Sequence, residues 1–328
     1  MKATNLSANG WTRFGRCLVL LLSLAICCHL APAAEGQGMR LEVTMIAPRP
    51  AILLHEPLVL DIQVRNAGPS PATMDRLNCN LKGLALRVTG PEGKTRGCRP
   101  GVSVNLLRSR QVVLAPDQVY LYRMVLLHGM LGSDGKRKTP GYVFPVPGQY
   151  SVVLTYHPGY PKGSTFEAAA LQVFVEEPQG RDREALELFC NESIQHFFTM
   201  NPSDGQMDAP KDFQRLAEEY ADTAYGRFAQ FYLLGDLSRV LAMKDDERQK
   251  SLAALEGLAR NAEFPLPDEV LLHLGLCYAC LERKAEAVKV LKDLLAKYPK
   301  SPVAVKAKKR LEKLGTKARA PTTSPPSP

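Results

Sequence analysis

The segment DEVLLHLGLCYACLERKAEAVKVLKDLLAKYP covers residues 268–299 and follows a regular pattern of residue size. Large, small and aromatic residues alternate at set positions before a closing proline, namely Leu271, Leu274, Gly275, Tyr278, Ala287, Leu291 and Pro299. This pattern predicts two helices joined by a turn, in a unit of about 34 residues. One such unit cannot bury its own apolar face, so it has to stack on neighbouring helices.

The pattern resembles the tetratricopeptide repeat, and the resemblance extends over residues 210–314. A second, degenerate unit precedes the clear one, because Phe231, Leu234, Gly235 and Ser238 have the spacing of Leu271, Leu274, Gly275 and Tyr278. An insertion near 244–247 lengthens this first unit, and Ser301 caps a final helix that begins at Pro302. The resemblance implies a short all-α solenoid whose groove binds a peptide.

Helical periodicity begins after a polar linker, PQGRDR, at residues 178–183. Apolar residues of the next segment fall on one helical face, with Asp182 as the predicted N-cap. We therefore expect an all-α domain over residues 184–316. The closing stretch 317–328 contains PTTSPPSP, a low-complexity composition that predicts a disordered tail.

Residues 39–177 have the alternating pattern of β-strands, as in LVLDIQV at 58–64 and YSVVLTY at 150–156. The stretches LLHEPLVLDIQVRNAG and FPVPGQY resemble strands and the closing hairpin of bacterial immunoglobulin-like domains, although those domains often have glycine where this chain has His55. The predicted fold class is therefore a two-domain chain, with an all-β immunoglobulin-like sandwich followed by an all-α tetratricopeptide-like short solenoid.

The N-terminus has the layout of a secretory signal peptide over residues 1–34. Basic residues precede an uncharged apolar run from Cys17 to Leu30, and Ala31-Pro32-Ala33 supplies small residues for cleavage. This layout predicts export to the periplasm or the cell surface. Two alternatives stay open, namely an uncleaved membrane anchor and a lipoprotein that carries its lipid on Cys27 or Cys28.

The net charge of the whole chain is +9, of which the predicted signal contributes three positive charges. This mild excess is far short of a nucleic-acid-binding stripe, so we expect no nucleic-acid partner. Basic residues concentrate near the C-terminus, from Lys306 to Arg319. They suit a solvated capping helix, and the alternative is a weak contact with an anionic envelope surface.

Five cysteines follow the predicted signal, too few and odd in number for a disulfide scaffold. Cys79 and Cys98 flank a predicted hairpin, and they are either bonded to each other or two buried thiols. His273, Cys277 and Cys280 share one helical face, an arrangement compatible with zinc but also with tight helix packing beside Gly275. The packing interpretation is favoured, and we predict no metal and no cofactor.

No set of residues in the sequence has the pattern of a catalytic site. His55-Glu56 is followed by Pro57 and lacks the second histidine of a zinc-protease motif. We therefore predict a non-enzymatic adaptor that binds a protein or peptide through the groove of the helices, with contacts from Phe228, Tyr232, His273 and Lys308. Two alternatives stay open: a proteinase inhibitor that acts through the 129–141 loop, and a hydrolase built around His128 or His157.

Overall fold

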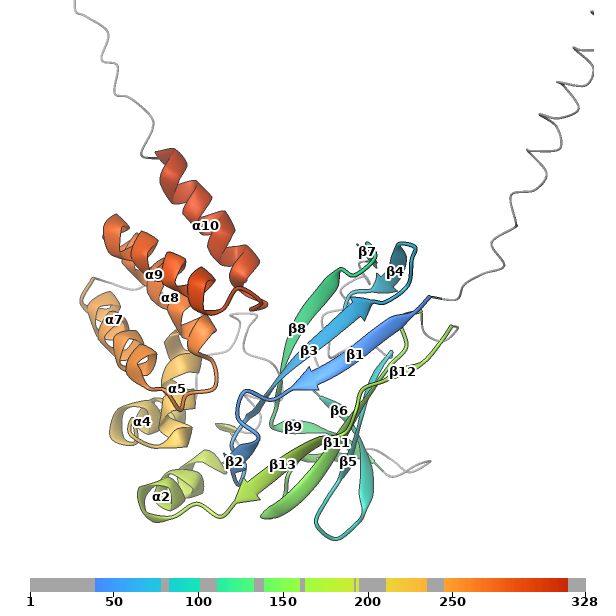
Figure 1. Cartoon of the computed structure of the whole chain (residues 1–328). Coiled ribbons are helices and arrows are strands. Elements are labelled where there is room, and N and C mark those ends of the chain that lie inside the picture. Colours follow the sequence, from blue (N-terminus) through green and yellow to red (C-terminus); the bar gives the residue numbers. More distant parts are fainter. Residues whose placement is uncertain are drawn as a thin grey trace, which may run out of the picture. The chain divides into compact units, whose positions relative to one another are not determined.

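The first half of the chain forms β-strands (Figure 1). Apolar residues alternate along several of them. The computed structural model describes residues 39–77, 83–100, 111–132, 139–159, 163–191, 193–194, 211–234 and 245–317. Their strands are β1 (Leu41–Ile46), β2 (Ala51–Leu53), β3 (Leu58–Asn66), β4 (Ala72–Asp75), β5 (Leu84–Thr89), β6 (Thr95–Pro100), β7 (Gln111–Leu114), β8 (Val119–Leu126), β9 (His128–Gly132), β10 (Thr139–Tyr142), β11 (Gly148–Tyr156), β12 (Phe166–Glu167) and β13 (Leu171–Glu176).

Three sheets contain these strands. The largest has the order β10-β9-β6-β5-β11-β13-β2, with β12 paired to β11, and it is mixed because β2 runs parallel to β13. A second, antiparallel sheet has the order β1-β3-β8, and β4 pairs with β7 in a third. A turn at Pro116-Asp117, with Asp117 at a φ of 61°, carries the chain from the β4–β7 sheet into the β1-β3-β8 sheet.

The second half of the chain is helical. Its helices are α2 (Gly180–Phe189), α4 (Lys211–Glu219), α5 (Ala224–Leu234), α7 (Asp245–Arg260), α8 (Pro267–Cys280), α9 (Lys284–Lys297) and α10 (Ala304–Lys317). Helix α2 begins inside the predicted linker, with Gln179 rather than Asp182 at its N-cap. The Asp182 carboxylate instead accepts a hydrogen bond of 2.8 Å from the Ala224 N–H, at the first residue of α5.

Strands and helices share buried side chains. Val59 of β3 belongs to one cluster with Phe228, Phe231 and Leu274. Leu127, between β8 and β9, belongs to another cluster with Ala185 and other residues of α2, α4 and α5. These two clusters therefore contain apolar groups from both halves of the chain.

The predicted fold class is wrong. The chain is mixed α/β with mixed sheets, rather than an all-β sandwich beside an all-α solenoid. The described residues from Leu41 onward form one compact unit. The reason is that periodicity identifies the apolar face of each element but not what covers it, and strands from the first half cover part of the helical face.

Three groups of expectations fall on residues outside those that the structure describes. They are the signal peptide and its alternatives at 1–34, the centre of the 129–141 loop, and the tail from 318 onward. The repeat positions Gly235 and Ser238, and part of the predicted insertion near 244–247, also lie outside the described residues. Among the helices of the described ranges, none has the length and apolar character needed to cross a membrane.

Candidate functional site: the helical repeat and its junction with the sheets

Helices α8 and α9 form the hairpin that the residue pattern predicts. A Cβ on Gly275 would lie 2.8 Å from two side-chain atoms of Leu291, so the two helices cross where only hydrogen fits. Ala287 and Leu291 are both fully buried on the facing helix. The Tyr278 hydroxyl donates a hydrogen bond of 2.6 Å to Oε1 of Glu256, which connects α8 with α7. The small and aromatic positions therefore set the spacing of three consecutive helices.

Helix α10 closes the row of helices. The Ser301 Oγ accepts a hydrogen bond of 3.0 Å from the Val303 N–H, which is the predicted cap, although the regular helix begins at Ala304. The same hydroxyl donates to Oδ2 of Asp268 at 2.5 Å. Asp268 lies in the first turn of α8, so this contact fixes the start of α10 against the start of α8.

A buried ion-pair cluster joins the same helix start to the β1-β3-β8 sheet. Arg123 of β8, whose side chain is only 10% exposed, makes two hydrogen bonds of 2.7 and 2.8 Å to Asp61 of β3. Its Nη1 also contacts Oδ1 of Asp268 at 2.6 Å and Oε1 of Glu269 at 3.2 Å. Burial raises the pKa of Glu269, and Arg123 opposes that rise. We call Arg123, Asp61, Asp268 and Glu269 the Arg123 cluster.

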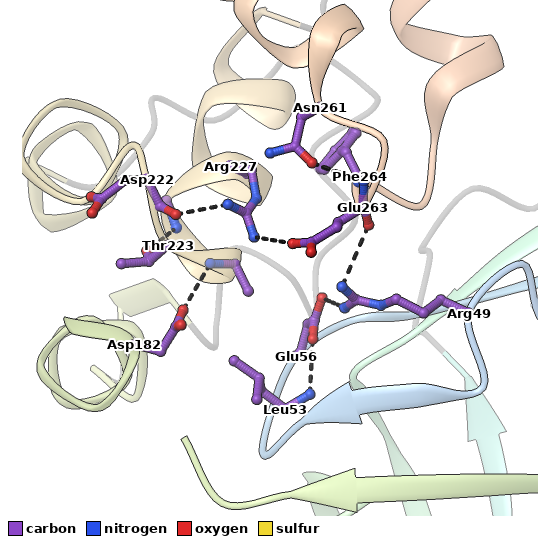
Figure 2. Close-up of polar contacts among 12 residues, drawn as sticks. Arg49, Leu53, Glu56, Asp182, Asp222, Thr223, Arg227, Asn261, Glu263 and Phe264 are labelled. Carbon is purple, nitrogen blue, oxygen red and sulfur yellow. Dashed lines mark hydrogen bonds and ion pairs between the residues drawn. The ribbon is translucent and has the colours of Figure 1, made fainter. Parts of the chain in front are cut away.

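A second polar junction lies where the β2–β3 turn meets the loop between α7 and α8, as Figure 2 shows. The buried Glu56 carboxylate pairs with Arg49 and accepts a hydrogen bond of 2.8 Å from the Leu53 N–H. Arg49 also donates to the Glu263 carbonyl at 3.4 Å. Burial raises the pKa of Glu56, and the positive charge of Arg49 opposes the shift.

From Glu263 the polar contacts continue into α5 (Figure 2). The Glu263 carboxylate lies 4.0 Å from Arg227, whose Nη1 donates to the Asp222 carbonyl at 2.7 Å. The Tyr225 hydroxyl donates to the Leu54 carbonyl at 2.5 Å, a further contact between α5 and the β2–β3 turn. Polar contacts therefore attach the row of helices to the sheets both near α5 and at the start of α8.

A third cluster at the junction contains chemically reactive residue types. The His55 Nδ1 lies 3.2 Å from the Cys190 Sγ, and the His55 ring stacks on Tyr142 with centroids 3.6 Å apart. The His128 ring lies 4.1 Å from Tyr142, and its buried Nε2 has no hydrogen-bond partner within the described residues. His55 has a φ of 60°, a backbone conformation that favours glycine.

A cysteine beside a histidine is the arrangement of a nucleophilic pair, but the electrostatics here oppose that role. Burial raises the pKa of the Cys190 thiol. Burial also lowers the pKa of His55 to about 4, with a smaller contribution from His128. Cys190 follows the C-terminus of α2, where the helix dipole disfavours a thiolate. At neutral pH the pair is therefore a neutral thiol and a neutral imidazole.

Acid is expected to destabilise the protein through these two histidines. Burial lowers the pKa of both His55 and His128 to about 4 from an ordinary 6.5, so the stability they contribute is complete above pH 6.5 and is lost as the pH falls towards 4. Both rings are partly exposed, so after discounting for solvent screening the expected loss for the pair is about 2 kcal/mol. Urea unfolding at a series of pH values measures it.

The matched variant for this prediction is His55→Asn with His128→Gln, because asparagine tolerates the left-handed backbone at position 55. Burial raises the pKa of Glu56 and Glu269, so their effect on stability has the opposite sign, and the difference between parent and variant is the informative quantity. Equal slopes of stability against pH in the two proteins between pH 6.5 and 4 would contradict the assignment.

Of the four predicted contact residues, Phe228, Tyr232 and His273 lie at one buried cluster, and Lys308 lies apart from them on α10. Phe228 is fully buried in a cluster with Val59, and Tyr232 packs against the same cluster. His273 is partly buried, with its ring 5.6 Å from that of Phe231. Lys308 lies exposed on α10. Three of the four therefore lie in or beside the core, and only Lys308 offers an exposed surface, so partner binding by this set stays a prediction.

The structure describes only some of the cysteines for which the sequence predicted a role. Cys98 is buried, but Cys79 lies outside the described residues, so their bond stays a prediction. Cys277 is fully buried, and burial raises the pKa of its thiol.

In the described part of the chain, no three His, Cys, Asp or Glu side chains are grouped as metal ligands. His157 lies 2.9 Å from the Thr165 hydroxyl through its Nδ1.

Comparisons with known proteins identify the repeat. A family model described as a tetratricopeptide repeat matches residues 269–301, which covers most of α8 and all of α9. No curated protein matches the chain in sequence.

Solved structures resemble the chain only weakly. A β-glucosidase from Erythrobacter marinus is 15% identical over 42% of this chain and 16% of its own length, with a TM-score of 0.23. Alkylpurine DNA glycosylase AlkC of Pseudomonas fluorescens is 11% identical over 40% of this chain and 31% of its own, with a TM-score of 0.22. The chain thus spans about a sixth of the length of the β-glucosidase. At such TM-scores these likenesses carry no argument about fold or function, and the comparisons support a tetratricopeptide repeat at residues 269–301.

Proposed function

We propose that this protein is a non-enzymatic adaptor that binds another polypeptide through its helices. The observation that carries the proposal is the tetratricopeptide repeat at 269–301, because such repeats generally mediate interactions between proteins. The Gly275 crossing and the Ser301 cap support it, since they make α8, α9 and α10 a regular packed row. The Arg123 cluster supports the further proposal that the sheets hold this row in a fixed position.

The proposed contact surface differs from the groove expected from the sequence. Residues of α8 are buried or half-buried throughout, whereas α9 and α10 each present an exposed, lysine-rich side. A partner of the folded protein therefore has the outer sides of α9 and α10 available to it. We further propose that the protein works outside the cytoplasm, on the basis of the N-terminal sequence alone.

Site-specific photo-crosslinking tests the adaptor proposal. A benzophenone amino acid is placed at the exposed positions Lys292 of α9 and Lys306 of α10, and for comparison at Val113 of β7 and Phe174 of β13, which are 60% and 53% exposed. After irradiation of cells that make the full chain, mass spectrometry identifies the adducts. The proposal predicts the same polypeptide at both helix positions and not at the sheet positions. Adducts at the sheet positions only, or at none, would contradict it.

A further inference from the structure

Positive charge is concentrated at the C-terminal end of the helices. Residues 284–313 contain ten lysines and arginines against three acidic residues, whereas residues 180–283 contain eleven against nineteen. The change of sign falls at the start of α9. The last two helices therefore differ in charge from the helices on which they stack.

Several arginines elsewhere in the described part of the chain have acidic partners, an arrangement that Lys308 and Lys309 of α10 do not share. Arg65, Arg87, Arg181 and Arg215 each lie within 3.1 Å of a carboxylate oxygen. Lys308 and Lys309 are both exposed, and neither forms an ion pair with any described residue. Their charge is therefore available to a carboxylate on another molecule.

One exposed apolar side chain lies among these lysines. Val305 is 73% exposed, more than any other large hydrophobic residue of the described chain. Lys308, Lys309 and Glu312 follow it at i+3, i+4 and i+7, so all four share the outer face of α10. A terminal helix needs a polar outer face, and valine is a weaker helix former than lysine. Val305 therefore departs from the polar outer face that is expected of a terminal helix.

The opposite face of α10 is already occupied. Val303 and Ala307 are buried in a cluster with Leu272, Leu291 and Leu294, and Leu311 packs against it. A helix that binds a bilayer inserts its apolar face between lipids. Because that face of α10 is packed on α8 and α9, only one valine remains for insertion. The arrangement therefore favours a polypeptide over a membrane.

We propose that the outer face of α10 docks an acidic segment of a partner polypeptide, with Val305 as its apolar anchor and Lys308 and Lys309 pairing with carboxylates. This inference rests on the proposed adaptor function and assigns it a surface and a partner chemistry. Electrostatic complementarity of this kind mainly sets the association rate and the choice of partner. An apolar residue enclosed by charged ones resembles the centre and rim of a protein interface.

Binding of a defined probe tests the inference. The probe is a fluorescein-labelled synthetic peptide of six glutamates around a central leucine, titrated with the full chain and read by fluorescence anisotropy. The reversal variant is Lys308→Glu with Lys309→Glu. The matched control is Lys211→Glu with Lys250→Glu, two exposed lysines of α4 and α7 whose reversal changes the net charge equally. Val305→Ser tests the anchor.

We expect the reversal variant to bind the peptide about tenfold more weakly, since each reversed lysine exchanges an attraction for a repulsion. The control should bind within about twofold of the parent, and Val305→Ser about threefold more weakly. Equal loss in reversal and control variants would show an effect of net charge and overturn the inference. The inference is also overturned if the chain sediments with phosphatidylserine vesicles but does not bind the peptide.

The photo-crosslinking experiment separates this inference from the adaptor function. If the adduct formed from Lys292 persists when Lys308 and Lys309 are reversed, the protein has a polypeptide partner but the α10 face is not its docking surface. If no polypeptide adduct forms from any helix position, the adaptor function itself fails, whatever the synthetic peptide does.

Discussion

A Gly226→Ala variant is expected to lose about 3 kcal/mol or more of its free energy of unfolding. A Cβ at this position in α5 would lie 1.8 Å from the Tyr220 carbonyl oxygen and 2.9 Å from that of Leu216. Both are backbone atoms, which cannot turn aside as a side chain can. The methyl group would therefore force α4 and α5 apart. Urea unfolding followed by circular dichroism measures the loss.

Gly257→Ala is the matched control. Gly257 lies in α7, and an added Cβ would meet no atom within 4 Å. Because alanine is the better helix former, this variant should gain about 0.5–1 kcal/mol. A similar stability change in both variants would mean that α4 and α5 do not approach as closely at Gly226 as the structure has them.

The second large effect is expected for Arg123→Ala, at about 3–5 kcal/mol of lost stability. The substitution leaves the carboxylates of Asp268 and Asp61, which are 3% and 22% exposed, without their shared cation. Arg123 also opposes the rise in pKa that burial causes at Glu269, so without Arg123 the Glu269 carboxyl takes up a proton more readily. The difference in free energy of unfolding between the parent and the variant should therefore become smaller as the pH falls from 7 towards 4.

Arg65→Ala controls for the loss of an arginine from an ion pair. Arg65 pairs with Glu42 and Asp117, but its side chain is 43% exposed. Exposed pairs of this kind contribute little to stability, so the loss should be much smaller than for Arg123→Ala. If the two alanine variants have equal stability at pH 7, the Arg123 cluster does not join helices and sheets in solution in the way described here.

The α8–α9 hairpin was predictable because its requirements are local. Gly275, Ala287 and Leu291 meet within one hairpin, so their residue types and spacing encode the crossing. The alternation in residues 58–64 likewise predicts a strand, and β3 extends it to Asn66, with side chains that alternate between buried and half-buried along most of its length. Patterns of this kind need no knowledge of distant residues.

The fold class and the junction were not predictable in the same way. Arg123 and Asp268 are 145 residues apart, and His55 and Cys190 are 135 apart, so no spacing rule brings them together. Phe228 and Tyr232 were expected in a groove because an aromatic cluster on a helix suits a binding surface and a core equally well. Strand β3 decided between them, because its Val59 belongs to the cluster that buries Phe228.

The sequence does carry one signal for the close approach of α4 and α5. A glycine inside a strongly apolar helix, such as Gly226, often marks a close approach of two backbones. The left-handed backbone at His55 had a similar hint, since glycine was the residue expected there from the resemblance. Both residues lie where two secondary-structure elements meet, and hydrophobic periodicity alone does not specify such contacts.

The central claim is that the helices and the sheets form one cooperative unit, in which the repeat is held by the Arg123 cluster. Native-state hydrogen exchange at increasing urea concentration tests it most directly. The amides of β3 and of α8 should open with the same free energy, and Arg123→Ala should lower both by the same amount. If α8 opens at a free energy well below that of β3, and the variant changes only one of them, the repeat folds independently of the sheets and the claim is wrong.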